Sequence, residues 1–318
     1  MRVVAALGGN ALLRRGEPAE AETQRQNLVR AGRALAEVAA EHELVVTHGN
    51  GPQVGLLALQ SEAYRSVRPY PFDVLVAESE GMVGYLLDQT LANLLPERQI
   101  ATLLTQVVVD ERDPAFEAPT KPVGPVYDEA DARRLSAERG WAIAPDGDGW
   151  RRVVASPEPL RIVELDTIRV LAEAGVLVIC SGGGGVPVIE HRGVLRGVEA
   201  VIDKDLAAAL LAIELEADAL LLLTDVPGVQ ENFGTDSARL IREATPAELR
   251  ELGLPAGSMA PKTEAACRFA ERTGGLAVIA ALDDAALALE GHAGTRIAIR
   301  GNYEPRLVAG ADARTRER

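Results

Sequence analysis

Apolar runs alternate with segments of helical periodicity along most of the chain. An uninterrupted apolar run at residues 3–7 is followed by apolar side chains at the spacing of one helix face across residues 22–41, and then by a second run at residues 44–47. Alternation of this kind is typical of βαβ units, in which buried strands pair in parallel and helices pack on the sheet. The pattern therefore predicts an α/β protein with a mostly parallel sheet covered by helices on both faces.

The same alternation continues to residue 299. It predicts strands at residues 100–109, 176–180, 220–223, 277–279 and 296–299, and helices at residues 53–64, 73–95, 162–173, 203–215, 261–272 and 283–290. Residues 111–159 break the pattern, because seven prolines and both tryptophans gather there. Long insertions in compact domains are usually lids or other functional loops, and the tryptophans favour an ordered one, so we expect an ordered excursion from the sheet.

Composition and charge exclude several classes of protein. The chain has 318 residues, 47% of them apolar and 25% charged, which is typical of a globular protein. Its net charge of −14 and its 3% of aromatic residues argue against binding to nucleic acid or to an anionic membrane. No apolar segment reaches the ~20 residues that span a bilayer, and no signal peptide is evident, so we expect a cytoplasmic protein. Two cysteines and four histidines without metal-binding spacing predict neither a disulfide framework nor a zinc site.

Lysine is almost absent from the chain. Among 33 basic residues only Lys121, Lys204 and Lys262 are lysine, and all the others are arginine. Such a bias exchanges the two residues wherever a solvated positive charge is enough, but a compact ammonium group fits crowded anionic centres that a planar guanidinium cannot enter. The three lysines are therefore candidate functional residues, although each one alone could also be a surface ion-pair partner.

Glycine-bearing turns follow four of the expected strands, at residues 8–10, 49–51, 182–185 and 225–228. Because the carboxyl ends of parallel strands lie on one edge of a sheet, where open α/β proteins bind ligands, we expect the turns to meet there. Glycine lets backbone N–H groups approach an anion closely. Four such turns on one edge indicate an anion site, whereas a single one could simply permit a tight turn.

The familiar nucleotide-binding signatures are missing from the sequence. Residues 256–263 resemble the end of a P-loop, but Ala256 and Pro261 occupy the positions where that motif needs glycine, and no G-x-G-x-x-G opens a helix after a strand. Lys204 and Lys262 lie at the starts of expected helices, and the third lysine lies in the proline-rich excursion. Lysines beside anion-binding turns point to phosphoryl transfer, in which positive groups stabilise negative charge spread over oxygen atoms.

Seven motifs of this chain closely resemble those of the carbamate kinases, which belong to the amino acid kinase superfamily. They are G-G-N-A at residues 8–11, H-G-N-G-P-Q-V-G at 48–55, T-Q-V-V-V-D at 105–110, P-T-K-P-V-G-P at 119–125, G-G-G-G-V-P-V at 182–188, G-V-E-A-V-I-D-K-D at 197–205 and G-S-M-A-P-K at 257–262. The proline-flanked Lys121 segment is the most specific, because it separates carbamate kinases from other members of the superfamily. The resemblance extends from about residue 3 to residue 299.

The resemblance implies the amino acid kinase fold, a three-layer α/β/α sandwich on a mainly parallel sheet of the eight-stranded type, with a small protruding lobe. Residues 1–318 would form a single domain, with an acceptor-binding half at about 1–175, the lobe at about 111–159, a nucleotide-binding half at about 176–300 and a polar tail at 301–318. It also implies a homodimer that transfers a phosphoryl group reversibly between ATP and carbamate, giving ADP and carbamoyl phosphate, with Mg²⁺ accompanying the nucleotide.

The resemblance also assigns a role to each candidate site residue. Gly8, Gly9 and Asn10 would bind the transferred phosphoryl group, Gly49, Asn50 and Gly51 the carbamate, and Gly182 and Gly183 would also contact substrate. Lys204 and Lys262 would stabilise the transferring phosphoryl group, Asp203 would hold both lysines in position, and Lys121 would reach in from the lobe. Asp225, Phe233, Gly257, Ser258 and Met259 would surround the nucleotide, and no protein ligand to a metal is assigned.

Two alternatives agree with part of this prediction. A related kinase of the same fold could phosphorylate an amino-acid carboxylate, a nucleoside monophosphate or a phosphonate, although the compact turn at residues 49–51 suggests little room for a larger acceptor. A metabolite-binding relative could have lost turnover, but all three lysines and Asp203 are present. No motif positions a Ser, Cys or His nucleophile, so we expect direct in-line transfer without a covalent enzyme intermediate.

Overall fold

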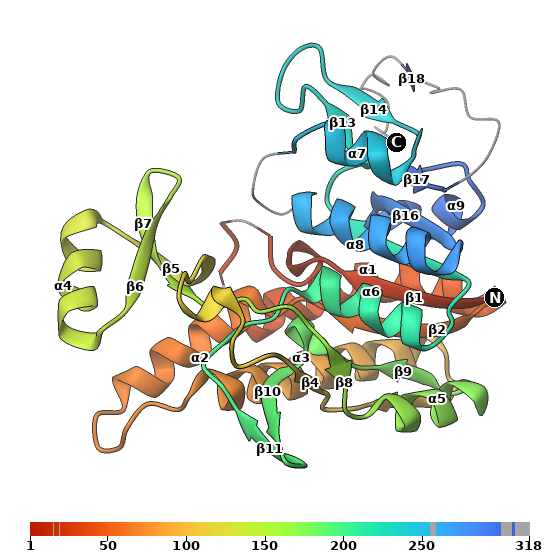
Figure 1. Cartoon of the computed structure of the whole chain (residues 1–318). Helices are drawn as coiled ribbons and strands as arrows, with labels where there is room; N and C mark the ends of the chain where they lie inside the picture. Colours follow the sequence, from red (N-terminus) through yellow and green to blue (C-terminus); the bar gives the residue numbers. More distant parts are fainter. Residues whose placement is uncertain (15, 19, 255–258, 300–306, 309–318) are drawn as a thin grey trace.

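An eight-stranded sheet runs through the middle of the molecule (Figure 1). The structure is a computed structural model that describes residues 1–14, 16–18, 20–254, 259–299 and 307–308. In spatial order the strands are β15 (Glu243–Ala244), β17 (Thr295–Ile297), β16 (Leu276–Ala281), β12 (Ala219–Thr224), β1 (Arg2–Leu7), β2 (Glu43–His48), β9 (Leu177–Ile179) and β3 (Ile100–Thr102). All neighbours pair in parallel except β16 and β17, so the expected mainly parallel sheet is confirmed.

Helices cover both faces of this sheet. One face carries α1 (Ala21–Glu41), α3 (Phe72–Leu94) and α9 (Ala285–Leu289), and the other carries α5 (Leu165–Glu173), α6 (Lys204–Glu214), α7 (Pro246–Glu251) and α8 (Met259–Thr273). Side chains of a strand alternate between the two sides of a sheet. Accordingly Val3, Ala5 and Leu7 of β1 pack with the first group of helices, and Val4 and Ala6 pack with the second. The expected three-layer arrangement is confirmed.

The strand expected at residues 100–109 is in fact two strands in two sheets. β3 ends at Thr102, and β4 (Gln106–Val108) belongs to a four-stranded sheet of order β11 (Val194–Gly197), β10 (Val186–His191), β4 and β8 (Arg161–Ile162). Between them the N–H of the buried Thr105 donates to a side chain, Glu80 Oε2 at 3.2 Å. The sequence does not reveal this break, because Thr102, Thr105 and Gln106 interrupt the apolar residues without a glycine or proline to mark the end of a strand. The helix expected from residue 162 begins at Leu165, since Ile162 belongs to β8.

The hairpin of β10 and β11 is not predicted by the pattern either. Its two-residue turn, Arg192 and Gly193, has positive φ angles of 51° and 79°. Two consecutive positive φ angles are typical of tight hairpins, but Asn or Asp usually precedes the glycine there. Because arginine occupies that position here, the sequence does not indicate the turn.

Residues 121–154 form a lobe that projects from the rest of the molecule, at the left of Figure 1. It consists of an antiparallel sheet of order β5 (Lys121–Tyr127), β7 (Gly149–Val154) and β6 (Ala142–Asp146), with α4 (Glu129–Arg139) beside it. β5 touches α2 (Gly51–Ala63), because a Cβ atom on Gly55 would lie 2.8 Å from the Cα of Gly124. The expected lobe is confirmed. Its first strand contains Pro122 and Pro125, which an edge strand tolerates because part of its N–H groups need no partner.

The remaining elements are short. A three-stranded sheet has the order β13 (Gln230–Glu231), β14 (Arg239–Ile241) and β18 (Leu307–Val308), and 3₁₀ turns occur at η1 (Gly9–Ala11), η2 (Pro114–Phe116), η3 (Gly182–Gly184) and η4 (Leu282–Asp284). Apart from β18, the tail expected at residues 301–318 lies outside the described residues.

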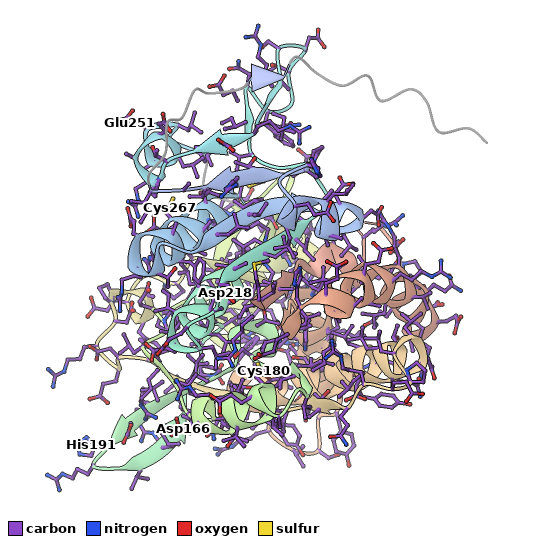
Figure 2. All side chains as sticks on the ribbon, turned by 90° about the vertical axis from the view of Figure 1, so that its right-hand side faces the viewer. Asp166, Cys180, His191, Asp218, Glu251 and Cys267 are labelled. Atoms are coloured by element: carbon purple, nitrogen blue, oxygen red, sulfur yellow. The ribbon has the colours of Figure 1, made fainter. Side chains whose placement is uncertain are left out.

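Both cysteines are buried free thiols. Cys267 lies on α8 and Cys180 directly follows β9, and Figure 2 shows them at different levels of the molecule. None of the helices in the described segments has the length and apolar character needed to cross a membrane.

Candidate active site

The four glycine-bearing turns lie side by side at one edge of the sheet. They follow β12, β1, β2 and β9, which are consecutive strands that all pair in parallel. The backbone ties the turns to their neighbours, because the N–H of Gly8 donates to Leu223 O (3.0 Å) and the N–H of Gly49 donates to Leu7 O (2.9 Å). The topology therefore produces the predicted meeting of the turns.

Gly49 lies where two turns and a lysine come into contact. A Cβ atom at this position would be 2.9 Å from the backbone N of Gly9 and 3.2 Å from Cδ of Lys204. Backbone at 2.9 Å leaves no space for a side chain, so this position requires glycine. Gly51 differs, because it begins α2 with open space around its Cα.

Asp205 holds two of the three lysines. It lies in the first turn of α6, and its carboxylate accepts hydrogen bonds from Lys204 Nζ at 3.0 Å and from Lys262 Nζ, on α8, at 2.9 and 3.1 Å. The side chains of Asp205 and Lys262 are only 3% and 4% exposed. Burial alone would raise the pKa of Asp205, but the two ammonium groups outweigh it and hold that pKa at about 2.

The pKa values of the two lysines bound to Asp205 are shifted in opposite directions. Burial, together with the positive charge of Lys204, lowers the pKa of Lys262 to about 8. Burial also acts to lower the pKa of Lys204, but the carboxylates of Asp205 and Asp203 outweigh it and raise that pKa. Lys204 therefore stays charged at neutral pH, and Lys262 is the lysine whose charge responds to mildly alkaline conditions.

Asp203 joins the lobe to the helix that carries Lys204. It is the N-cap of α6, where Oδ1 accepts the N–H groups of Asp205 (3.0 Å) and Leu206 (3.3 Å). Its other oxygen accepts a hydrogen bond from Lys121 Nζ of the lobe at 2.6 Å. Burial acts to raise the pKa of Asp203, but the charges of Lys121 and Lys204 outweigh it and lower that pKa.

The role expected of Asp203 needs a correction. The resemblance assigns it to hold Lys204 and Lys262, but its carboxylate is bonded to Lys121, and Asp205 makes the bonds to the other two lysines. The physical reason is the N-cap, which occupies one carboxylate oxygen of Asp203 with backbone N–H groups and leaves the other for the lobe. The signal for a second carboxylate is present in the sequence, since Lys204 is flanked by an aspartate on each side.

Asn50 and Gly183 bring the second and third turns together. Asn50 is 3% exposed, and its Nδ2 donates a hydrogen bond to Ser79 Oγ of α3 at 2.7 Å. A Cβ atom on Gly183 would lie 2.1 Å from Asn50 Nδ2, and Gly183 has a φ of +67°. Both the close approach and the left-handed backbone require glycine at this position.

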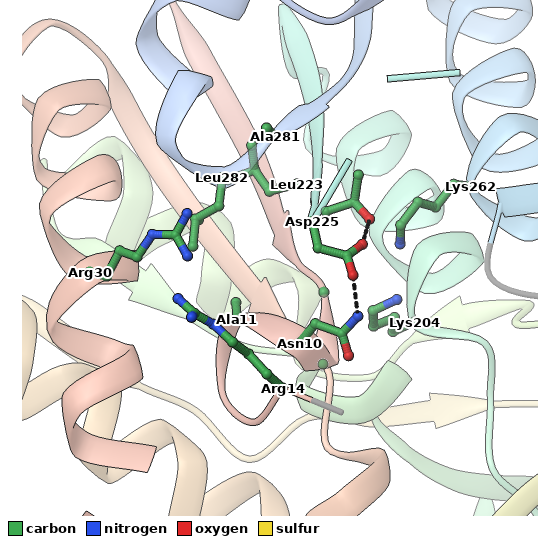
Figure 3. Close-up of a pocket in the computed structure, with 13 residues that line it drawn as sticks. Asn10, Ala11, Arg14, Arg30, Lys204, Leu223, Asp225, Lys262, Ala281 and Leu282 are labelled. Carbon is green, nitrogen blue, oxygen red and sulfur yellow. Dashed lines mark hydrogen bonds between the residues drawn. The ribbon is translucent and has the colours of Figure 1, made fainter. Parts of the chain in front are cut away.

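A cavity of about 430 Å³ opens at this edge of the sheet (Figure 3). The lining residues are Gly8, Gly9, Asn10, Ala11, Arg14, Arg30, Lys204, Leu223, Thr224, Asp225, Lys262, Ala281 and Leu282. Asn10 Nδ2 donates to Asp225 Oδ2 at 2.7 Å, which joins the first turn to the fourth. The volume is that of a small-molecule site. The sequence does not single out Arg14 and Arg30, because arginine is the common cation of this chain.

The residues expected around a nucleotide are only partly brought together. Asp225 lines the cavity, but Phe233, which follows β13, is 70% exposed and does not line it. Met259, at the start of α8, packs against the hydrophobic core instead. Gly257 and Ser258 lie outside the described residues. Across the described ranges, no three His, Cys, Asp or Glu side chains form a group that could hold a metal ion.

Known proteins resemble this chain over nearly its whole length. The sequence profile of the Amino acid kinase family matches residues 1–281. A carbamate kinase of Rhizobium meliloti is 56% identical over 301 residues, 93% of each chain, and one of Haemophilus influenzae is 54% identical over 300 residues, 93% of this chain and 96% of that one. A solved carbamate kinase of Giardia lamblia, bound to AMP-PNP, superposes with a TM-score of 0.86 at 42% identity, covering 94% of this chain and 98% of that one.

Proposed function

The chain belongs to the amino acid kinase family, among the carbamate kinases, and we propose that it transfers a phosphoryl group reversibly between ATP and carbamate, giving ADP and carbamoyl phosphate. The observation that carries the proposal is the convergence of all three lysines on one helical turn, Lys121 on Asp203 and the other two on Asp205. Three ammonium groups against two carboxylates leave an excess positive charge beside the glycine turns. A phosphoryl group in transfer carries negative charge that such a site stabilises.

Lys204 and Lys262 are the proposed catalytic cations. Both line the cavity and both are anchored by Asp205, so their charges are fixed before the substrate arrives. Fixed charges aimed at a transition state cost no reorganisation during the reaction, and this preorganisation is the main source of their effect. Lys121, whose side chain is 32% exposed, would add a third positive charge from the lobe.

The two substrates would enter from opposite halves of the sheet edge. The turns at residues 49–51 and 182–183 would bind carbamate, and the turn at residues 8–10 would bind the phosphoryl group between them. Asp225 lines the cavity and would contact the nucleotide there. Phe233 and Met259 lie outside this lining and Gly257 and Ser258 lie outside the described residues, so these four are proposed as nucleotide contacts on the resemblance alone.

Transfer would be direct. The lining of the cavity includes no Ser, Cys or His among the described residues, so no side chain of those types is placed to carry the phosphoryl group. The carbamate oxygen would attack the phosphorus in line with the departing ADP, and the protein would contribute alignment and charge rather than a nucleophile. Asp203 would act as an organiser of Lys121 and not as a general base, since both of its oxygens are occupied.

Mg²⁺ would enter with the nucleotide. The residues fit such an ion, because Mg²⁺ keeps several waters and binds through substrate phosphates and one or two carboxylates, and Asp225 is an exposed carboxylate in the cavity. When bound, the ion would neutralise part of the phosphate charge. The residues of this chain would bind and orient the rest of the substrate.

We also propose a homodimer, as in the resemblance. Large apolar side chains stay exposed on the outer side of α3 and beside it, with Tyr85 at 54% and Leu104 at 55% exposure. Leu104 lies against Gly81 of α3, so these two parts of the surface are close to one another. Light scattering during gel filtration tests this proposal, and a mass near 33.7 kDa at micromolar concentration would contradict it.

A panel of acceptors tests the reaction itself. ADP release from ATP is measured with carbamate, with amino-acid carboxylates, with nucleoside monophosphates and with a phosphonate. We expect turnover with carbamate alone. A preference for another acceptor would assign the chain to a different kinase of the same fold. ATP binding without exchange of label between ATP and ADP would identify a metabolite-binding protein.

A further inference from the structure

Two adjacent polar residues of α3 are buried although neither lines the cavity. Ser79 is 0% exposed and Glu80 is 1% exposed. A buried carboxyl group is costly in its charged form, and burial raises the pKa of Glu80 to about 8, with the charge of Glu164 adding to the effect. No step of the proposed reaction uses either side chain, so their burial asks for another explanation.

Glu80 fastens the third glycine turn to the strand connection beside it. Its Oε1 accepts the N–H of Gly182 at 2.8 Å, and its Oε2 accepts the N–H of Thr105 at 3.2 Å. Thr105 binds the residues on both sides of the glycine run. Its Oγ1 accepts the N–H of Ser181 at 3.0 Å, and its backbone oxygen accepts the N–H of Val186 at 2.8 Å. The run at residues 182–185 is therefore clamped at its first residue and on both flanks.

Ser79 fastens the second turn from the preceding position of the same helix. Its Oγ accepts a hydrogen bond from Asn50 Nδ2 at 2.7 Å and donates one to Val76 O at 2.8 Å. Because the Asn50 amide lies directly against Gly183, the two turns share one interface. One stretch of α3 thus fixes both turns that the proposed function assigns to carbamate.

These hydrogen bonds determine which N–H group of the glycine run is free to bind a ligand. The N–H of Gly182 is used by Glu80, that of Gly184 donates to Ser181 O (3.1 Å), and that of Gly185 donates to Gly182 O (3.0 Å). Within the described part of the chain, the N–H of Gly183 is the one in this run that has no acceptor. An anion at the turn would therefore meet the N–H of Gly183 rather than that of Gly182.

We propose that Ser79 and Glu80 are positioning residues of the acceptor site, with Glu80 orienting the Gly183 N–H and Ser79 orienting the Asn50 amide toward the carbamate group. This inference rests on the proposed function. Neither side chain touches a reacting atom. Each acts through a backbone or amide group that it holds, and together they make the acceptor pocket rigid before carbamate or carbamoyl phosphate binds.

Steady-state kinetics of ATP formation from ADP and carbamoyl phosphate test the proposal. In Glu80→Gln the amide NH₂ replaces one of the two accepting oxygens and faces a backbone N–H, so we expect the KM for carbamoyl phosphate to rise at least tenfold while the KM for ADP stays within twofold. Ser79→Ala should shift the same constant in the same direction. Glu173→Gln, at an exposed position of α5 on the other face of the sheet, is the matched control and should leave both constants unchanged.

The split between the two KM values separates positioning from a merely structural role. Equal rises of both constants, or no rise in Glu80→Gln and Ser79→Ala, would overturn the proposal. If Glu80→Gln does not fold, Thr105→Val provides a second variant, since it removes the acceptor of the Ser181 N–H with little change of shape.

Amide hydrogen exchange gives a readout that needs no turnover. Peptides covering residues 181–186 should exchange at least tenfold faster in Glu80→Gln than in Glu173→Gln, while peptides covering β1 exchange alike. Unchanged exchange at residues 181–186 would overturn the inference even in an active enzyme. A wild-type chain that does not use carbamoyl phosphate would instead overturn the proposed function. The exchange data would still show whether Glu80 holds the turn at residues 182–185.

Discussion

Lys262 Nζ lies 2.9 Å from Asp205 Oδ2, and the two side chains are only 4% and 3% exposed. The same carboxylate also accepts a hydrogen bond from Lys204, so one buried negative charge organises two positive ones. Buried charges that lose their partner keep the full cost of leaving water. The arrangement therefore links the stability of the fold directly to the electrostatics of the cavity.

Asp205→Asn should be strongly destabilising. It leaves the ammonium groups of Lys204 and Lys262 without their shared carboxylate, and breaking a buried pair in this way costs about 3–5 kcal/mol. Denaturant titration followed by circular dichroism measures the free energy of unfolding. Asp166→Asn, at a side chain that is 95% exposed, serves as the control and should change this free energy by about 0.5 kcal/mol or less. Equal effects of the two substitutions would contradict the role given to Asp205.

Asp203→Asn should separate activity from stability. Asparagine caps a helix about as well as aspartate, so we expect the free energy of unfolding to fall by about 1 kcal/mol or less. The charge that holds Lys121 is lost, however, and we expect kcat/KM for carbamoyl phosphate to fall about tenfold, the equivalent of ~1.4 kcal/mol. Unfolding curves and initial rates on the same preparation check both statements. An unchanged kcat/KM would mean that Lys121 needs no carboxylate to act.

Arginine should replace the three lysines unequally. The ammonium groups of Lys204 and Lys262 share the one buried carboxylate of Asp205, and a larger planar guanidinium at either position would disturb this arrangement. We expect Lys204→Arg and Lys262→Arg to lower kcat by about 100-fold or more. Lys121, at 32% exposure on the lobe, should lose less than tenfold in kcat as arginine. The reverse order in the initial rates would contradict this account of why lysine remains here.

The pH profile should report the charge of Lys262. Burial and the neighbouring Lys204 lower its pKa to about 8, so the free protein loses this positive charge as the pH rises through about 8. We expect kcat/KM for carbamoyl phosphate to decline above that pH, and the limb in kcat to lie at higher pH, because a bound anion favours the ammonium form. Burial also raises the pKa of Glu80 to about 8, so Glu80→Gln is the control that separates the two groups, and it should keep the same limb. A profile of kcat/KM that stays flat to pH 9.5 would show that Lys262 titrates elsewhere.

The fold, and the edge of the sheet where the site lies, could be predicted from the sequence for a physical reason. Apolar runs separated by helical periodicity specify a parallel sheet, and the ends of parallel strands collect at one edge whatever their order. Two of the turn glycines are required by close contacts, because a Cβ atom would lie 2.9 Å from the Gly9 backbone at Gly49 and 2.1 Å from the Asn50 amide at Gly183. The scarcity of lysine in the sequence marked the three lysines as candidates. In the structure all three are bonded to Asp203 or Asp205, at the start of α6.

Other features depend on side-chain direction, which the pattern does not carry. Asp203 and Asp205 are equivalent in the sequence, but the N-cap turns one toward the lobe and leaves the other for the two lysines. In the sequence Glu80 is an ordinary residue of a predicted helix, and only the structure shows that it accepts the N–H of Gly182. Arg14 and Arg30 line the cavity without any motif, since tertiary packing alone brings them there.

ATP formation from ADP and carbamoyl phosphate, by the wild-type chain and by Lys204→Ala in the same coupled assay, tests the central claim most directly, with Mg²⁺ omitted as the control. We predict that the wild type forms ATP and that Lys204→Ala loses ~3–4 kcal/mol of transition-state stabilisation, which is a fall in rate of about 100-fold to 1,000-fold. Absence of ATP formation by the wild type, or a wild-type rate in Lys204→Ala, would contradict the account.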